Sequence, residues 1–159
     1  MTRKLARPMV SAIFVTGGLD SLRSPAPKAP VAEDVAIPVA EAVGLPTDTE
    51  LLVRINGAVQ LGAGLLFAAG RLPRLSALAL AATLVPTTLA AHRFWELEDD
   101  GERHAQQIQF LKNLSIFGGL VLASLDTGGR PSLPWRARRG ARRTRTVARK
   151  ATEALPPGD

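Results

Sequence analysis

The sequence contains no cysteine, no tyrosine and only two histidines among its 159 residues. Without cysteine the chain has no disulfide framework, no thiolate nucleophile, no CxxC redox pair and no cysteine-ligated iron–sulfur or zinc site. His92 and His104 supply few ligands for a metal, so we expect no metal site built by the protein. A redox role would therefore need a cofactor or a partner protein.

Long apolar runs, in contrast, occupy much of the chain. Each is close to the ~20 residues that cross a bilayer as a helix. They show almost no polar face at helical spacing, which in a chain this short indicates lipid rather than a large core. The sequence thus predicts an all-α fold, an integral membrane four-helix bundle with spans near residues 5–22, 51–70, 72–91 and 108–125.

The connecting segments set the organisation of this bundle. Residues 71–74 are so short that the second and third spans must form a hairpin. The Pro-rich segment 23–50 contains a stretch, 35–45, that fits either a short helix in the membrane interface or an extended loop. We expect a membrane domain over 1–129 and a disordered basic tail over 130–159.

Charge along the chain predicts an orientation. Lys and Arg gather near the N-terminus, in segment 71–74 and in the tail, whereas segments 23–50 and 92–107 each hold five acids against two Lys or Arg. Cytoplasmic segments of membrane proteins carry an excess of Lys and Arg. Both termini and the hairpin are therefore expected on the cytoplasmic side of a plasma membrane.

Several polar residues fall inside the predicted spans. At 1.5 Å per residue, Asp20, Arg54 and Lys112 lie roughly 7–10 Å outward of the middle of their spans. A charge at the centre of a membrane helix costs about 2.5–3.5 kcal/mol, so we expect Asp20 to offset Arg54 or Lys112. The sequence leaves a ligand pocket, a structural network and simple snorkelling open for the full set: Asp20, Arg54, Asn56, Gln60, His92, Lys112 and Asn113.

Two further sets are expected at the inner side. Arg7 and Asp126 are placed to form an inner pair. The tail resembles polybasic juxtamembrane segments, in which each Lys or Arg near anionic lipid contributes about 1 kcal/mol. Nucleic-acid binding is not expected, because Trp135 alone supplies an aromatic ring there. The expected headgroup contacts are Arg136, Arg138, Arg139, Arg142, Arg143 and Arg145.

Three stretches carry a family resemblance. They are "RPMVSAIFVTGGLDSLRSP" near the N-terminus, "NGAVQLGAGLLFAAGRLPRLSALALAATLVPTTLAAHRFWE" in the middle and "QFLKNLSIFGGL" later. In this order they resemble the DoxX family of small four-span bacterial membrane proteins, over about residues 7–126. The resemblance implies association with redox or oxidative-stress systems, and no catalytic residues come with it.

The most concrete functional hypothesis is a membrane subunit or scaffold of a redox or oxidative-stress system, with quinone as the candidate ligand of the outer cluster. It favours a non-catalytic subunit over an enzyme acting alone, with the bilayer and soluble redox enzymes as partners. A small-molecule or proton-coupled transporter using the buried charges is one alternative. A structural anchor that recruits soluble partners through its basic tail is another.

Overall fold

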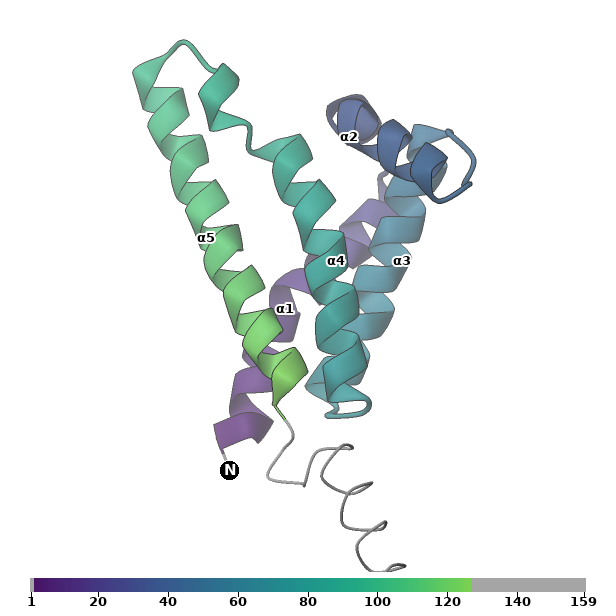
Figure 1. Ribbon diagram of the computed structural model, residues 1–159, viewed down its shortest axis with the longest axis vertical. Coiled ribbons are helices and arrows are strands. Elements are labelled where there is room, and N and C mark those ends of the chain that lie inside the picture. The colour runs from purple at the N-terminus through teal and green to yellow at the C-terminus, as the bar shows by residue number, and fades with distance from the viewer. Residues whose placement is uncertain (1, 127–159) are drawn as a thin grey trace, which may run out of the picture. The chain divides into compact units, whose positions relative to one another are not determined.

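The computed structural model describes residues 2–126, apart from the side chain of Arg3, and these residues form helices joined by short connectors (Figure 1). The chain divides into two units, residues 1–125 and 126–159, and only the first is treated below. Its elements are α1 (Thr2–Arg23), α2 (Ala29–Ala42), α3 (Thr49–Ala68), α4 (Pro73–Ala91), the 3₁₀ turn η1 (Phe94–Glu96) and α5 (Asp100–Leu125). The predicted all-α class is confirmed.

Helix α2 resolves the alternative left open for segment 23–50. The helix begins at Ala29, before residues 35–45, and ends at Ala42 within that stretch. Pro30 lies in its first turn, where a missing N–H costs nothing. Gly44, with φ +70°, follows its end, and Leu45 N donates to Ala40 O at 2.8 Å. A glycine in this conformation is a common helix terminator.

The remaining boundaries also have local causes. Asp48 caps α3 by accepting a hydrogen bond from Leu51 N at 3.1 Å. Gly70, with φ +69°, ends α3, and Pro73 begins α4, which makes the predicted hairpin. Asp99 Oδ1 accepts from Glu102 N at 2.8 Å and so begins α5 well before the predicted residue 108.

Packing joins the helices in a series. Helix α1 packs most extensively against α3, α3 packs against α4, and α4 packs against α5, while α2 lies against both α3 and α4 (Figure 1). The buried core is small and draws on α1, α3, α4 and α5. It consists of Phe14, Phe67, Ala77, Leu80, Ala81, Leu84 and Leu120.

Large apolar side chains cover much of the outer surface. On α5, Leu111, Leu114 and Leu122 are each at least half exposed. Apolar surface of this extent marks contact with a membrane or a partner. Within the described residues, three helical segments are long and apolar enough to cross a membrane: Thr49–Ala68, Pro73–Glu96 and Asp100–Leu125. Each contains an 18-residue stretch with a mean hydropathy of 1.5. Helix α1, the first predicted span, does not reach this level.

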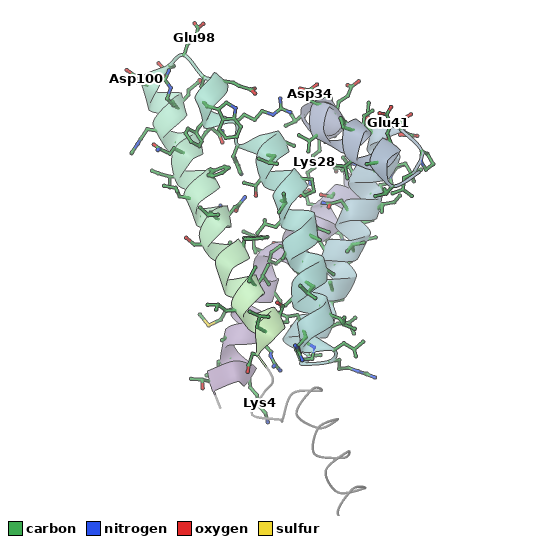
Figure 2. The ribbon with its side chains drawn as sticks, in the orientation of Figure 1. Lys4, Lys28, Asp34, Glu41, Glu98 and Asp100 are labelled. Atoms are coloured by element: carbon green, nitrogen blue, oxygen red, sulfur yellow. The ribbon has the colours of Figure 1, made fainter. Side chains whose placement is uncertain are left out.

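Charged side chains gather toward the ends of this unit. Figure 2 shows Lys4 at one end, and Glu98 and Asp100 at the opposite end, close to the connector before α5. Asp34 and Glu41 on α2 lie toward the same end as Glu98. Lys112, halfway along α5, is an exception to this distribution.

Candidate functional site

A cavity of about 500 Å³ lies beneath α2, lined by residues of α1, α2, α3, α4 and the connectors on either side of α2. We call it the α2 cavity. This volume is within the range of sites that hold small molecules. Its walls are mainly aliphatic, with Val31, Val35 and Val39 from α2, Leu52 and Val59 from α3, and Ala90 from α4.

Polar groups line one part of this aliphatic cavity. Asn56 Nδ2 and Gln60 Nε2, one turn apart on α3, both donate to Thr87 Oγ1 on α4, at 3.2 and 3.4 Å. Thr87 Oγ1 in turn donates to the carbonyl of Thr83 at 2.8 Å. Gln60 is only 6% exposed, whereas Asn56 and Thr87 are partly buried, so the network runs from the interior to the cavity wall. We call Asn56, Gln60 and Thr87 the amide–threonine network.

One ion pair ties the start of α2 to α1. Lys28 Nζ lies 2.6 Å from Asp20 Oδ2, and it donates to Ser21 Oγ at 3.0 Å. Lys28 lines the α2 cavity, and within the described residues it is the cavity's one ionisable side chain. The Asp20 side chain is 65% exposed, so the pair adds little stability. Its effect is to neutralise the cation beside the cavity.

A second ion pair ties α2 to the end of α4. Arg93 Nη1 lies 3.1 Å from Asp34 Oδ2 and 3.6 Å from Glu96 Oε2. The Nε atom of Arg93 also donates to the carbonyl of Leu89 at 3.0 Å, which fixes the guanidinium at the helix end. In Figure 2 Asp34 lies on the part of α2 nearest to α4. Helix α2 is thus held over the cavity from two sides.

The seven residues expected in one outer network separate into groups. Asp20 pairs with Lys28, so the expectation that it offsets Arg54 or Lys112 is wrong. Arg54 pairs instead with Glu50 one turn away, at 3.5 Å and with its side chain half exposed. Lys112 is exposed and donates to Gln109 on its own helix. Both cations find local partners at the surface because their helix faces point away from the bundle.

Two other predicted residues join α4 to α5. Asn113 Nδ2 donates to Thr88 Oγ1 at 3.0 Å, and both side chains are buried. His92 Nδ1 and Gln106 Oε1 are 2.7 Å apart near the end of the same helix pair. Of the predicted set, only Asn56 and Gln60 line the α2 cavity. Asn113 and His92 instead contact residues across the α4–α5 side of the molecule.

The predictions for the inner side of the membrane concern residues that lie partly outside the described part of the chain. The Arg7 guanidinium carbon lies 6.0 Å from the centre of the Phe67 ring, within the range of a cation–π contact. A pair of Arg7 with Asp126 stays a prediction. The headgroup contacts expected of Arg136, Arg138, Arg139, Arg142, Arg143 and Arg145 lie outside the described residues.

Sequence reasoning missed Lys28 and Thr87 as site residues. Thr83 and Thr87 stand one turn apart in an apolar helix, a spacing that indicates a polar helix face. Each hydroxyl can also bond a backbone carbonyl of its own helix, so the spacing is not specific for a site. Lys28 lies in the Pro-rich segment before residues 35–45, the stretch that fits either a helix or a loop, so the sequence gives no signal for its contact with Asp20. Among the described residues no group of three His, Cys, Asp or Glu side chains could hold a metal ion.

These observations define a helical membrane protein with a cavity of about 500 Å³ beneath a short surface helix. The sequence matches the DoxX family over residues 3–93, which is 91 of its 159 residues, and the chain belongs to this family. The matched part contains α1 to α4, and the resembling stretch "QFLKNLSIFGGL" on α5 lies beyond it. No curated protein and no solved structure gives a significant match.

Proposed function

We propose that this DoxX protein is a membrane subunit that holds a small amphiphilic molecule in the α2 cavity for a redox system, with quinone as the candidate ligand. The observation that carries the proposal is the amide–threonine network inside an otherwise aliphatic cavity of about 500 Å³. Small-molecule sites typically combine apolar walls with a few placed polar groups. A quinone has the matching parts, an apolar body and two oxygen atoms.

The role of the chain in this proposal is to bind and orient, not to transfer electrons by itself. The sequence has no cysteine, and the described residues hold no metal-binding group. A partner oxidoreductase would exchange electrons with the bound quinone. The aliphatic walls would exclude water, and the amides would fix the position of the quinone oxygens.

We also propose the placement of this subunit. The chain would lie in a bacterial plasma membrane as a four-span domain over residues 1–129, with α1 as the first span and both termini cytoplasmic. The basic N-terminus, the basic hairpin and the acidic segments 23–50 and 92–107 support this orientation. The basic tail over 130–159 would then contact anionic headgroups of the inner leaflet and the soluble redox enzymes.

Quinone content of the purified protein tests the proposal. We would extract the full chain from membranes into lipid nanodiscs and measure bound quinone per chain by mass spectrometry. Ala36 lines the α2 cavity, so Ala36→Leu fills part of it and should reduce bound quinone several-fold. Ala42 lies on the same helix, is exposed and does not line the cavity, so Ala42→Leu should leave the content unchanged.

The opposite results would reject the proposal. Wild-type protein with no more quinone than empty nanodiscs would show that this ligand is wrong. A quinone content that stays the same in Ala36→Leu would show that the ligand binds elsewhere. Co-purifying proteins, identified in the same samples, test the redox partner separately.

A further inference from the structure

The hydrogen bonds of Thr87 fix the direction of two amides. A threonine hydroxyl has one hydrogen to donate and two lone pairs to accept. Thr87 Oγ1 gives its hydrogen to Thr83 O at 2.8 Å. It therefore faces Asn56 and Gln60 only as an acceptor, and both amides must turn their NH₂ groups toward it.

The oxygen atoms of both amides consequently turn away from Thr87. Gln60 Oε1 lies beside Gly17 of α1, which also lines the cavity, since a Cβ atom added at Gly17 would be 3.9 Å from it. Within the described part of the chain, neither Gln60 Oε1 nor Asn56 Oδ1 accepts a hydrogen bond. Neither oxygen is a fully buried atom, so both are accessible to a ligand in the cavity. A ligand that covers them without donating leaves two acceptors unpaired, which costs free energy, so a ligand that donates hydrogen bonds is favoured.

Charge around the cavity favours a neutral ligand. The Lys28 ammonium is paired with Asp20 at 2.6 Å and also bonded to Ser21, so its charge is already compensated. An anionic head would have to displace Asp20, and a cationic head would find no acid in the cavity lining of the described residues. Among the lining side chains, the amides, the hydroxyls and the third N–H of Lys28 remain to receive the ligand head.

We propose that the α2 cavity selects a neutral, hydroxyl-headed amphiphile. Its head donates hydrogen bonds to Gln60 Oε1 and Asn56 Oδ1. Its aliphatic body lies along the valines of α2 and α3. The inference uses the same site as the proposed function and specifies its ligand class. Applied to a quinone couple, it states that the hydroquinone binds more tightly than the quinone.

The size of the preference for hydroquinone follows from the hydrogen bonds that each ligand can make with the two amides. Each amide keeps one further N–H, so a quinone carbonyl can still bind, but it leaves the amide oxygens unpaired. We expect the hydroquinone to bind about tenfold more tightly, in line with one lost hydrogen bond. For a two-electron couple a tenfold difference raises the reduction potential of the bound pair by about 30 mV.

Paired probes with the same body test the inference. Decyl-substituted benzoquinone and its hydroquinone would be bound, without oxygen, to the full chain in nanodiscs and quantified after equilibrium dialysis. Thr87→Val removes the hydroxyl that orients the amides, so the amides can turn, and the affinity ratio should fall from about tenfold toward one. Thr16→Val removes an exposed threonine hydroxyl of α1 that bonds only the carbonyls of Ala12 and Ile13 and does not line the cavity, so the ratio should persist.

Each outcome separates the inference from the proposed function. Quinone binding as tight as hydroquinone binding overturns the inference and leaves the function standing. Binding of the isoprenoid alcohol farnesol, with neither member of the couple bound, supports the hydroxyl-headed class and overturns the quinone function. No binding of any probe overturns both. Should Thr87→Val not fold, Gln60→Met replaces it, and must weaken hydroquinone binding more than quinone binding.

Discussion

Helix α3 has two contrasting sides. Toward α1 it packs so tightly that a Cβ atom added at Gly18 would lie 2.6 Å from Gly57 O, and one added at Gly57 would lie 2.9 Å from Gly18 O. Toward α2 and α4 the same helix borders the α2 cavity with Asn56 and Val59. One side brings backbones into contact, and the other leaves about 500 Å³ open.

The contrast shows how a small membrane protein can contain a cavity. Helices surrounded by lipid gain no hydrophobic free energy from meeting each other, so they associate through close packing and hydrogen bonds. Gly18 and Gly57 permit the closest packing on the α1–α3 side. Because that contact holds α3 in place, its other side need not be filled.

The substitution Gly18→Ala should have the largest effect on the stability of the protein. A Cβ in Gly18→Ala would meet two backbone atoms, Gly57 O at 2.6 Å and Leu61 N at 2.8 Å, which cannot move as a side chain can. Overpacking of this kind costs about 1–3 kcal/mol. We expect a clear loss of stability, measured as the unfolding midpoint in denaturant titrations of the protein in detergent micelles.

Gly62 supplies the matched control on α3. A Cβ added there meets nothing within 4 Å, so Gly62→Ala should leave stability unchanged or raise it slightly, because alanine is the better helix former. Equal unfolding midpoints for the two variants would contradict the tight contact between α1 and α3.

The polar contact between α4 and α5 should have an intermediate effect. Asn113 and Thr88 are both buried, and their hydrogen bond at 3.0 Å joins helices that lack the glycine contacts of α1 and α3. Hydrogen bonds between membrane helices average about 0.6 kcal/mol and reach about 1.7. A double-mutant cycle with Asn113→Leu and Thr88→Val should give a coupling in this range. A coupling near zero would show that apolar packing alone joins α4 to α5.

Much of the helical arrangement was predictable because length, hydropathy and capping residues act locally. The predicted spans 51–70 and 72–91 correspond to α3 at Thr49–Ala68 and α4 at Pro73–Ala91. Helix α5 begins earlier than predicted because Asp99 caps a polar first part that hydropathy does not detect. For α2 the sequence admitted a helix without deciding for it.

The site was less predictable because partners depend on helix rotation. Depth estimates put Asp20, Arg54 and Lys112 in one layer, but helices that are apolar all round give no signal for the direction in which each side chain points. Arg54 therefore meets Glu50 on its own helix, and Asp20 meets Lys28 from a segment whose structure was undecided. Asn56 and Gln60 were found as polar residues, but Thr87 as their shared partner was not.

Loosening α2 over the cavity should have the smallest effect. Asp34→Asn removes its ion pair with Arg93, and the Asp34 side chain is 75% exposed. Exposed pairs contribute at most about 1 kcal/mol, so global stability should change little. Local opening of α2 should become up to about fivefold more frequent, seen as faster amide hydrogen exchange in α2 with exchange in α3 unchanged.

Glu50→Gln is the matched control, because it removes an exposed ion pair of similar kind that lies within α3 and does not hold α2. Its exchange rates in α2 should equal those of the wild type. High salt should bring the wild type toward Asp34→Asn, because at 1 M ionic strength charges are screened beyond about 3 Å. If both variants, and the wild type at high salt, exchange alike in α2, then α2 is held over the cavity by apolar contacts with α3 and α4 alone.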